Sequence, residues 1–342
     1  MLDNILIYVL FLIGFYFLIK GSDLLIDGAT SLAKRLKISD LVVGLTIVSI
    51  GTSTPELFVN VISSLMGAPG IAIGNIFGSN IANILLILGV SAIIYPLPVQ
   101  QNTVFIEIPF SLTATLLVGF LANATLFQHV ELSTLTSMNF LYISRWDGLI
   151  LIIFFLLFMG YIVKIANEQA YKEKINQIMG LQNTDHNEYK ILSLKKTILY
   201  IIMGVIALTI GANWVVDGAV KIAKDIGFSD TFVGLTIIAV GTSLPELFTS
   251  TVAAYKKQAD IAIGNIIGSN IFNMLWILGV SAIINPLPFE LISNIDLFII
   301  IIVSSLLIFV LSLGQKYVIE RWNGILFLIL YITYIIFLVQ RG

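Results

Sequence analysis

Apolar segments long enough to cross a membrane recur along the whole chain and are separated by short polar breaks. A hydrocarbon core of about 30 Å requires roughly 20 helical residues. The pattern predicts ten such segments, near residues 2–36, 40–66, 70–95, 103–122, 146–165, 196–224, 231–256, 260–285, 292–313 and 322–339. We therefore expect an all-α integral membrane protein with about ten transmembrane helices.

One long polar stretch, Asn167 to Lys196, divides these segments into two groups of five. It contains five lysines beside four acidic residues, a composition typical of a solvated linker rather than a folded domain. We predict a first five-helix repeat over residues 1–166, a linker over 167–195 and a second five-helix repeat over 196–342.

The two halves of the chain are copies of one another. Residues 39–98 agree with residues 229–288 at 37 of 60 positions when they are aligned at a constant offset of 190, without a gap. The tetrapeptide at Arg145–Gly148 returns with one change at Arg321–Gly324, so the copy extends through the fifth segment. An odd number of crossings makes the second copy enter the membrane from the opposite side, which predicts two inverted repeats.

The basic residues predict how the chain is oriented in the membrane. With the amino terminus outside, 13 of the 18 Lys and Arg residues fall at inner ends of the segments or in the linker. The positive-inside rule then places both termini outside and the central linker in the cytoplasm of a multi-pass cell-membrane protein.

Composition excludes several classes of protein. Hydrophobic residues make up 58% of the chain and charged residues only 11%, whereas soluble domains contain about 25% charged residues. A soluble enzyme or a secreted scaffold is therefore a poor interpretation. The net charge of −2 offers no basic surface for nucleic acid, and the absence of Cys excludes disulfides and thiolate metal sites.

Two copies of one polar motif interrupt the middle of predicted helices. They are Gly51-Thr-Ser-Thr-Pro-Glu56 and Gly241-Thr-Ser-Leu-Pro-Glu246. Because Pro55 and Pro245 have no N–H, each helix is expected to break there and to leave carbonyl oxygens free. Irregular backbone at this depth survives only when it is buried in protein or lines a wet cavity.

The glutamates of these motifs, Glu56 and Glu246, require a compensating charge. A charged side chain at the bilayer centre costs on the order of 2.5–3.5 kcal/mol on insertion scales, and neither motif contains Lys or Arg. A protonated carboxyl that joins two helices would explain one buried Glu, but not two in symmetric positions on broken helices. We therefore predict a cation site, with hydroxyl groups of the same motifs as further oxygen ligands: Thr52, Ser53, Thr242 and Ser243.

The nature of these ligands indicates which metal would bind. An all-oxygen shell suits hard cations such as Ca²⁺, which takes six to eight oxygen ligands. Zinc or copper would favour His or Cys, and both histidines, His129 and His186, fall in polar loops.

A second pair of motifs is expected to complete the site. The two copies are Gly74-Asn-Ile-Phe-Gly-Ser-Asn-Ile-Ala-Asn83 and Gly264-Asn-Ile-Ile-Gly-Ser-Asn-Ile-Phe-Asn273. In each, the serine and the last asparagine are four residues apart and so share one helical face. We predict that the glycines serve helix packing and that the oxygen-bearing side chains join the cation site. These side chains are Ser79, Asn83, Ser269 and Asn273.

With these motifs the chain resembles the calcium/cation antiporter superfamily, in its Na⁺/Ca²⁺ exchanger family, close to the short prokaryotic exchangers. The pattern G-T-S-x-P-E followed by G-N-x-x-G-S-N-x-x-N matches that family's two alpha-repeats, and the resemblance covers essentially the whole chain. It implies a secondary active antiporter rather than an enzyme. Na⁺ and Ca²⁺ would bind as substrates, no cofactor would be needed, and a monomer would suffice for transport.

The resemblance also implies a role for each site residue. Glu56 and Glu246 would bind Ca²⁺ together with the backbone carbonyls of Thr52 and Thr242. The implied Na⁺ ligands are Ser53, Ser79, Ser243 and Ser269 with the carbonyls of Ser49 and Ala239, and Asn83 and Asn273 would lie at the centre.

One position bears on the choice of ion. Several prokaryotic relatives and the K⁺-dependent branch carry Asp where this chain has Asn273, so the expected site holds two formal negative charges. If the family stoichiometry of three Na⁺ to one Ca²⁺ applies, transport is electrogenic. The neutral Asn also argues against dependence on K⁺.

Three other functions remain open from the sequence, of which a cation channel would be revealed by single-channel currents. A proton/calcium exchanger of the same fold would release protons from the two glutamates, although that branch typically has G-N-x-x-E where this chain has G-T-S-x-P-E. A membrane enzyme could use the glutamates as an acid/base pair, but no nucleophile motif accompanies them. Calcium uptake driven by a pH gradient without Na⁺ would favour the proton exchanger.

Overall fold

The computed structural model describes residues 2–66, 70–124, 141–178, 191–226, 239–313 and 316–341. All long elements in these ranges are helices, and four of the predicted spans contain short π-helical turns, labelled η, in their interior or at their start. The helices of the first half are α1 (Leu2–Leu36), α2 (Asp40–Val43), η1 (Gly44–Val48), α3 (Ser49–Thr52), α4 (Thr54–Leu65), α5 (Gly70–Ala82), η2 (Asn83–Ile87), α6 (Leu88–Ile94), η3 (Thr103–Glu107), α7 (Ile108–Ala122) and α8 (Arg145–Ile178). Those of the second half are α9 (Leu194–Ile226), α11 (Ala239–Gly241), α12 (Leu244–Tyr255), α13 (Ala259–Ile271), η6 (Phe272–Ile277), α14 (Leu278–Ile284), α15 (Ser293–Ser312) and α16 (Arg321–Arg341).

The prediction of an all-α membrane protein is confirmed. Eight of the described helical spans are long and apolar enough to cross a membrane, and the bent span from Asp40 to Leu65 makes a ninth. The tenth predicted span, 231–256, is described only from Ala239 onwards, as α11 and α12.

Two short β ribbons reveal how the halves are related. Strand β1 (Leu97–Pro98) pairs with β4 (Val318–Ile319), and β2 (Tyr142–Ile143) pairs with β3 (Leu287–Pro288), both antiparallel. The sequence offsets of 190 and 176 relate β1 to β3 and β2 to β4. Each ribbon is therefore the counterpart of the other, as expected if a two-fold axis exchanges the two repeats.

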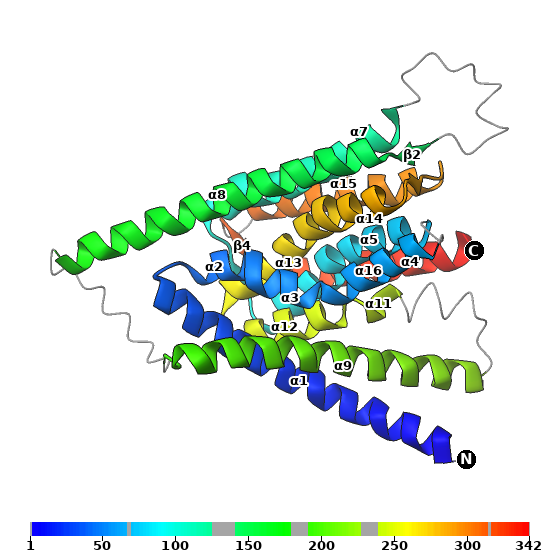
Figure 1. Cartoon of the computed structure of the whole chain (residues 1–342), viewed down its shortest axis with the longest axis horizontal. Coiled ribbons are helices and arrows are strands. Elements are labelled where there is room, and N and C mark those ends of the chain that lie inside the picture. Colours follow the sequence, from blue (N-terminus) through cyan, green and yellow to red (C-terminus); the bar gives the residue numbers. More distant parts are fainter. Residues whose placement is uncertain are drawn as a thin grey trace.

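Helices α1 and α9 form a layer of their own along one side of the bundle (Figure 1). They pack against each other at glycines: a Cβ built on Gly14 would lie 2.8 Å from the Gly211 carbonyl oxygen. Only glycine permits so close a crossing. These two helices are also much less buried than the central spans Ala72–Ile94 and Ala259–Ile284.

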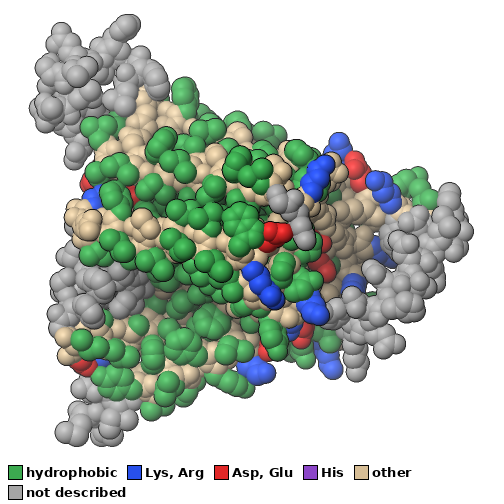
Figure 2. All heavy atoms as spheres, turned by 180° about the vertical axis from the view of Figure 1, so that it is seen from behind, with side chains coloured by type: hydrophobic (Ala, Val, Ile, Leu, Met, Phe, Trp, Pro, Cys, Tyr) green, Lys and Arg blue, Asp and Glu red, His purple; other side chains and the backbone are tan. Residues whose placement is uncertain are grey.

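The surface fits a protein surrounded by lipid. Figure 2 shows hydrophobic side chains over the middle of one face, with Lys, Arg, Asp and Glu gathered mainly at one end. That end carries the carboxyl terminus of α1 with its basic residues Lys34 and Arg35.

Helix α8 extends beyond the span predicted at 146–165, into the predicted linker as far as Ile178. The extension is rich in Glu, Gln, Ala and Lys and contains neither Pro nor Gly. These residues favour helix even without an apolar environment, so the helix continues past the end of the hydrophobic stretch.

Candidate functional site

Both Gly-Thr-Ser-x-Pro-Glu motifs lie at breaks in the helices. In the first half the axis bends by 47° between the segment that ends at Thr52 and the segment that begins at Thr54. Ser53 and Ser243 stand at the two breaks with nearly the same backbone angles, φ −81° and ψ 12° against φ −86° and ψ 6°. Each following Pro lies in the first turn of the next helix, where a missing N–H costs little. The predicted interruption of both helices is confirmed.

The glutamates Glu56 and Glu246 are buried in the interior, each with only 1% of its surface exposed. They lie in the first turns of α4 and α12, where the helix dipole favours negative charge. The described ion pairs include none to either glutamate. The protein therefore supplies two buried carboxylates without a basic partner among the described residues.

Serines of each repeat contact the glutamate of the other. The Ser53 hydroxyl donates to Glu246 Oε1 at 2.7 Å, and the Ser243 hydroxyl to Glu56 Oε1 at 3.3 Å. These contacts join residues 193 and 187 positions apart in the sequence. The break in each helix therefore contacts the glutamate of the broken helix in the other repeat.

The second pair of motifs adds the remaining predicted side chains. Ser269 Oγ lies 3.0 Å from Ser53 Oγ, and Ser79 Oγ lies 3.1 Å from Ser243 Oγ. Asn83 and Asn273 are fully buried at the start of the π-helical turns η2 and η6. The helix α12, which carries Glu246, contacts η2, and α4, which carries Glu56, contacts η6. We call these eight buried side chains the cage: Glu56, Glu246, Ser53, Ser243, Ser79, Ser269, Asn83 and Asn273.

Four oxygen atoms of the cage have no hydrogen-bond partner in the described part of the chain. They are Oε2 of both glutamates, Glu56 and Glu246, and Oδ1 of both asparagines, Asn83 and Asn273. An unpaired buried acceptor is costly, and an unpaired carboxylate far more so. A bound cation coordinated by these four oxygen atoms would compensate for their missing hydrogen bonds.

The threonines Thr52 and Thr242 turn their hydroxyl protons toward asparagines of the other repeat. Thr52 Oγ1 donates to Asn265 Oδ1 at 2.9 Å, and Thr242 Oγ1 to Asn75 Oδ1 at 3.2 Å. The resemblance assigned ligand roles to the carbonyls of these threonines, and these hydroxyl contacts do not occupy either carbonyl.

The two predicted carbonyl ligands outside the motifs differ in their surroundings. The carbonyl of Ser49 accepts the Ser53 N–H at 3.0 Å and also lies 3.3 Å from the Thr52 hydroxyl oxygen, and it remains a predicted ligand. Ala239 begins α11, and its carbonyl remains a predicted ligand.

A shell of amide and hydroxyl side chains that the sequence did not predict adjoins the cage. These residues hydrogen-bond to the predicted ligands or to one another, and they come in pairs at the repeat offset: Asn60 with Ser250, Asn75 with Asn265, and Asn80 with Asn270. Their duplication was the available signal. The spacing of residues along one helix shows which side chains share a face, but it could not reveal hydrogen-bond partners in the other repeat.

The glycines of the second motif pair in α13 lie at close helix contacts. A Cβ on Gly264 would lie 2.8 Å from the Leu41 carbonyl, and a Cβ on Gly268 would lie 2.6 Å from Ser49 Oγ. A Cβ built on Gly74 or Gly78 would meet no atom of the described residues within 4 Å. Residues 231–238, the repeat counterparts of the segment that packs on α13, lie outside the described ranges. The packing role predicted for the glycines is therefore confirmed for α13, where the helices are closely apposed, and stays a prediction for α5.

The chemistry of the cage suits a hard cation. In the described ranges no group of three or more His, Cys, Asp or Glu side chains could hold a metal ion, and both histidines lie outside these ranges. Two carboxylates surrounded by neutral oxygens match the preference of Ca²⁺ and Na⁺ rather than that of zinc or copper.

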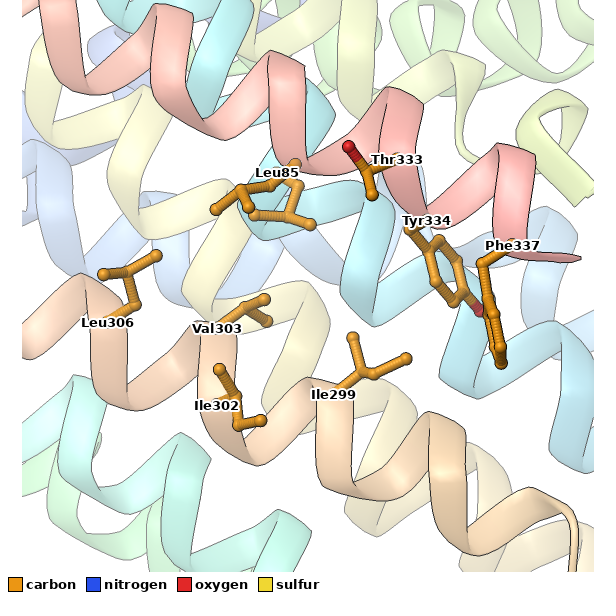
Figure 3. A pocket seen from close by; sticks show the side chains of 9 residues that line it. Leu85, Ile299, Ile302, Val303, Leu306, Thr333, Tyr334 and Phe337 are labelled. Atoms are coloured by element: carbon orange, nitrogen blue, oxygen red, sulfur yellow. The ribbon is translucent and has the colours of Figure 1, made fainter.

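A separate apolar cavity of about 330 Å³ lies between α15 and α16 (Figure 3). It is lined by aliphatic and aromatic side chains with Thr333 and the Tyr334 hydroxyl as the polar groups, and only Leu85 comes from the central spans. Because no carboxylate lines it, this cavity does not compete with the cage as a cation site.

Comparison with known proteins gives a consistent result across the chain. The family model described as sodium/calcium exchanger protein matches residues 6–164 and 196–340. An uncharacterised membrane protein of Methanocaldococcus jannaschii is 37% identical over 327 residues, which cover 94% of each chain. The sodium/calcium exchanger MaX1 of Methanosarcina acetivorans is 32% identical over 350 residues, covering 97% of this chain and 98% of that protein.

The fold matches a solved structure over almost the same length. The sodium-calcium exchanger NCX_Mj, soaked with Na⁺ and Ca²⁺, superposes with a TM-score of 0.75 at 34% identity. The match covers 97% of this chain and 98% of that one.

Proposed function

This chain belongs to the sodium/calcium exchanger family, and from that premise we propose that it exchanges Na⁺ for Ca²⁺ through the cage around Glu56 and Glu246. Members of the family are transporters, so the chain is an antiporter rather than an enzyme. The observation that carries the proposal is the symmetric set of four buried oxygens without a hydrogen-bond partner in the described ranges, in a cage whose two carboxylates form no ion pair there. Cations that take turns in the cage would satisfy them, and no cofactor is required.

The proposed ligands are the residues predicted from the two motif pairs. Ca²⁺ would lie between Glu56 and Glu246 with the carbonyls of Thr52 and Thr242. The flanking Na⁺ ions would use the hydroxyls of Ser53, Ser79, Ser243 and Ser269, the carbonyls of Ser49 and Ala239, and the central amides of Asn83 and Asn273.

The charge of the cage supports electrogenic exchange. Two carboxylates balance one Ca²⁺, whereas three Na⁺ exceed them by one positive charge. A stoichiometry of three to one would then move one net charge per cycle, worth about 2.3 kcal/mol for each 100 mV of membrane potential.

Alternating access would arise from movement of the α1–α9 pair against the rest of the bundle. Helix α1 packs closely on α12, whereas α9 has no comparable packing on α4, the symmetry counterpart of α12. A transporter open to one side of the membrane needs its two similar repeats to be packed differently, and this asymmetry fits such a state. The better packed side would be the closed one.

An ion pair strengthens the closed side. Lys256, at the end of α12, lies 3.0 Å from the carboxylates of Asp23 and Asp27 on α1. The repeat counterpart of Lys256 is Met66, which cannot form such a pair. With the linker in the cytoplasm and both termini outside, as the basic residues predict, the ion pair would close the cytoplasmic side.

Flux through proteoliposomes tests the function. Vesicles loaded with Na⁺ should take up Ca²⁺ when they are diluted into Na⁺-free buffer, and vesicles loaded with K⁺ or Li⁺ should not. Glu246→Gln should abolish this uptake while Glu290→Gln, at an exposed position of the bundle surface, should leave it intact. Uptake driven equally well by a pH gradient without Na⁺ would instead establish a proton/calcium exchanger.

A further inference from the structure

Two asparagines outside the predicted ligand set contact the central asparagines of the cage. We infer that Asn80 and Asn270 are positioning residues, which turn the Oδ1 atoms of Asn273 and Asn83 toward the transported cation. This inference rests on the proposed function, because it concerns how the cage meets its ion.

A backbone contact fixes the orientation of the Asn80 amide. Asn80 Nδ2 lies 3.3 Å from the backbone carbonyl oxygen of Asn270, to which it donates. A carbonyl can only accept a hydrogen bond, so the other end of the Asn80 amide must be its oxygen. That oxygen accepts a hydrogen bond from Asn273 Nδ2 at 3.0 Å.

The orientation of Asn273 follows from this contact. Since its NH₂ group is committed to Asn80, its Oδ1 must point in the other direction. That oxygen is buried and has no hydrogen-bond partner among the described residues. A neutral carbonyl-type oxygen of this kind is a suitable ligand for a hard cation.

The symmetric contact between the side chains of Asn83 and Asn270 gives Asn83 the same orientation. Asn83 Nδ2 donates to Asn270 Oδ1 at 2.9 Å, and Asn83 Oδ1 is likewise buried without a partner in the described ranges. All four asparagines are almost completely buried. The same side-chain contact on both sides of the two-fold relationship indicates a shared role rather than incidental packing, and the backbone contact of Asn80 adds a further constraint in one half.

The arrangement matters because an asparagine has two chemically opposite ends. If the amide of Asn273 turned over, it would present an NH₂ group to the cation and repel it. An aspartate at this position has two oxygens and needs no such control. Asn80 thereby allows a neutral residue to act as a cation ligand without a third negative charge in the cage.

This difference provides the test. Asn80→Ala should raise the Ca²⁺ concentration for half-maximal uptake by about tenfold, with the maximal rate within about threefold of the parent, because a ligand oxygen is lost rather than the fold. In an Asn273→Asp background the same Asn80→Ala change should raise it by less than about threefold. Asn270→Ala, compared with and without Asn83→Asp, tests the other half in the same way.

Asn123→Ala serves as the matched control. Asn123 and Asn294 form a reciprocal amide pair with distances of 2.8 and 3.0 Å, away from the cage. Its loss should leave the Ca²⁺ dependence unchanged. Size-exclusion profiles and thermal unfolding in detergent would identify a variant that does not fold, and the comparison would then rest on the other asparagine.

The outcomes separate the inference from the proposed function. An equal effect of Asn80→Ala in the parent and in the Asn273→Asp background, or no effect in the parent, would overturn the positioning role. Absence of Na⁺-driven uptake in the unmodified protein would instead overturn the proposed function. Titration calorimetry of Ca²⁺ with the same purified variants would still decide the inference in that case.

Discussion

Ser53 and Glu246 lie on opposite repeats, and the Ser53 hydroxyl donates to Glu246 Oε1 at 2.7 Å. Ser243 makes the matching contact with Glu56. Each carboxylate is therefore held by the repeat to which it does not belong. Movement of one broken helix against the other must change the contacts of both glutamates, so ion binding and the relative position of the repeats are linked.

Removal of the Ser53 hydroxyl should weaken the cage. Hydrogen bonds to charged groups contribute about 1.5–3 kcal/mol, so Ser53→Ala should raise the Ca²⁺ concentration for half-maximal uptake by roughly tenfold or more. Thr54→Ala is the control, because the Thr54 hydroxyl donates to the Ile50 carbonyl of its own span and not to the cage. Equal Ca²⁺ dependence in the two variants would contradict a role of Ser53 in binding.

The ion pair of Lys256 should bias the access equilibrium. Lys256→Met, which copies the residue of the other repeat, should release α1 from α12 and open the cytoplasmic side more often. Because the chain has no Cys, a single Ala259→Cys beside Lys256 can report this opening through labelling by a membrane-impermeant maleimide. We expect labelling about two- to fivefold faster, since partly exposed ion pairs contribute roughly 0–1 kcal/mol each.

Lys316→Met is the control for that measurement. Lys316 is exposed and lies over the Tyr317 ring rather than against α1. Its replacement should leave the labelling rate unchanged. Identical rates for the Lys256 and Lys316 variants would show that the ion pair has no influence on access.

The residue at position 273 should decide whether the Ca²⁺-transporting step depends on membrane potential. With two carboxylates the Ca²⁺-loaded cage is neutral, so exchange of Ca²⁺ for Ca²⁺ should vary little with a clamped membrane potential. Asn273→Asp adds a negative charge to the loaded cage, and the same exchange should then become voltage-dependent, because moving one charge through 100 mV is worth about 2.3 kcal/mol. Isotope exchange in vesicles clamped with valinomycin measures this, and a strong voltage dependence in the unmodified protein would refute the assumed charge.

Close packing around Gly268 should make it sensitive to substitution. A methyl group there would lie 2.6 Å from Ser49 Oγ and 2.7 Å from the Leu45 carbonyl, and overpacking typically costs about 1–3 kcal/mol. Gly268→Ala should therefore lower the unfolding temperature in detergent. Gly160→Ala, at an exposed position of α8, should leave it nearly unchanged because its methyl group would meet no atom of the described residues within 4 Å. A similar loss in both variants would contradict close packing as the cause.

The sequence predicted the helices and much of the cage from local features. Length and hydropathy define membrane spans because lipid leaves the backbone no alternative to internal hydrogen bonds. The helix breaks followed from Pro55 and Pro245, since a missing N–H acts at its own position in the chain. The constant offset of 190 then paired Glu56 with Glu246 and their serine and asparagine neighbours.

Only the tertiary structure decided which atoms meet. The contacts of Ser53 with Glu246 and of Asn80 with Asn273 join residues 193 positions apart, and no local pattern records a partner on another helix. The structure also decided that α1 packs on α12 while α9 does not pack comparably on α4. The two repeats are similar in sequence and so favour the same local structure, and which helix packs on which is decided by contacts between the repeats, such as the ion pair of Lys256 that Met66 cannot form.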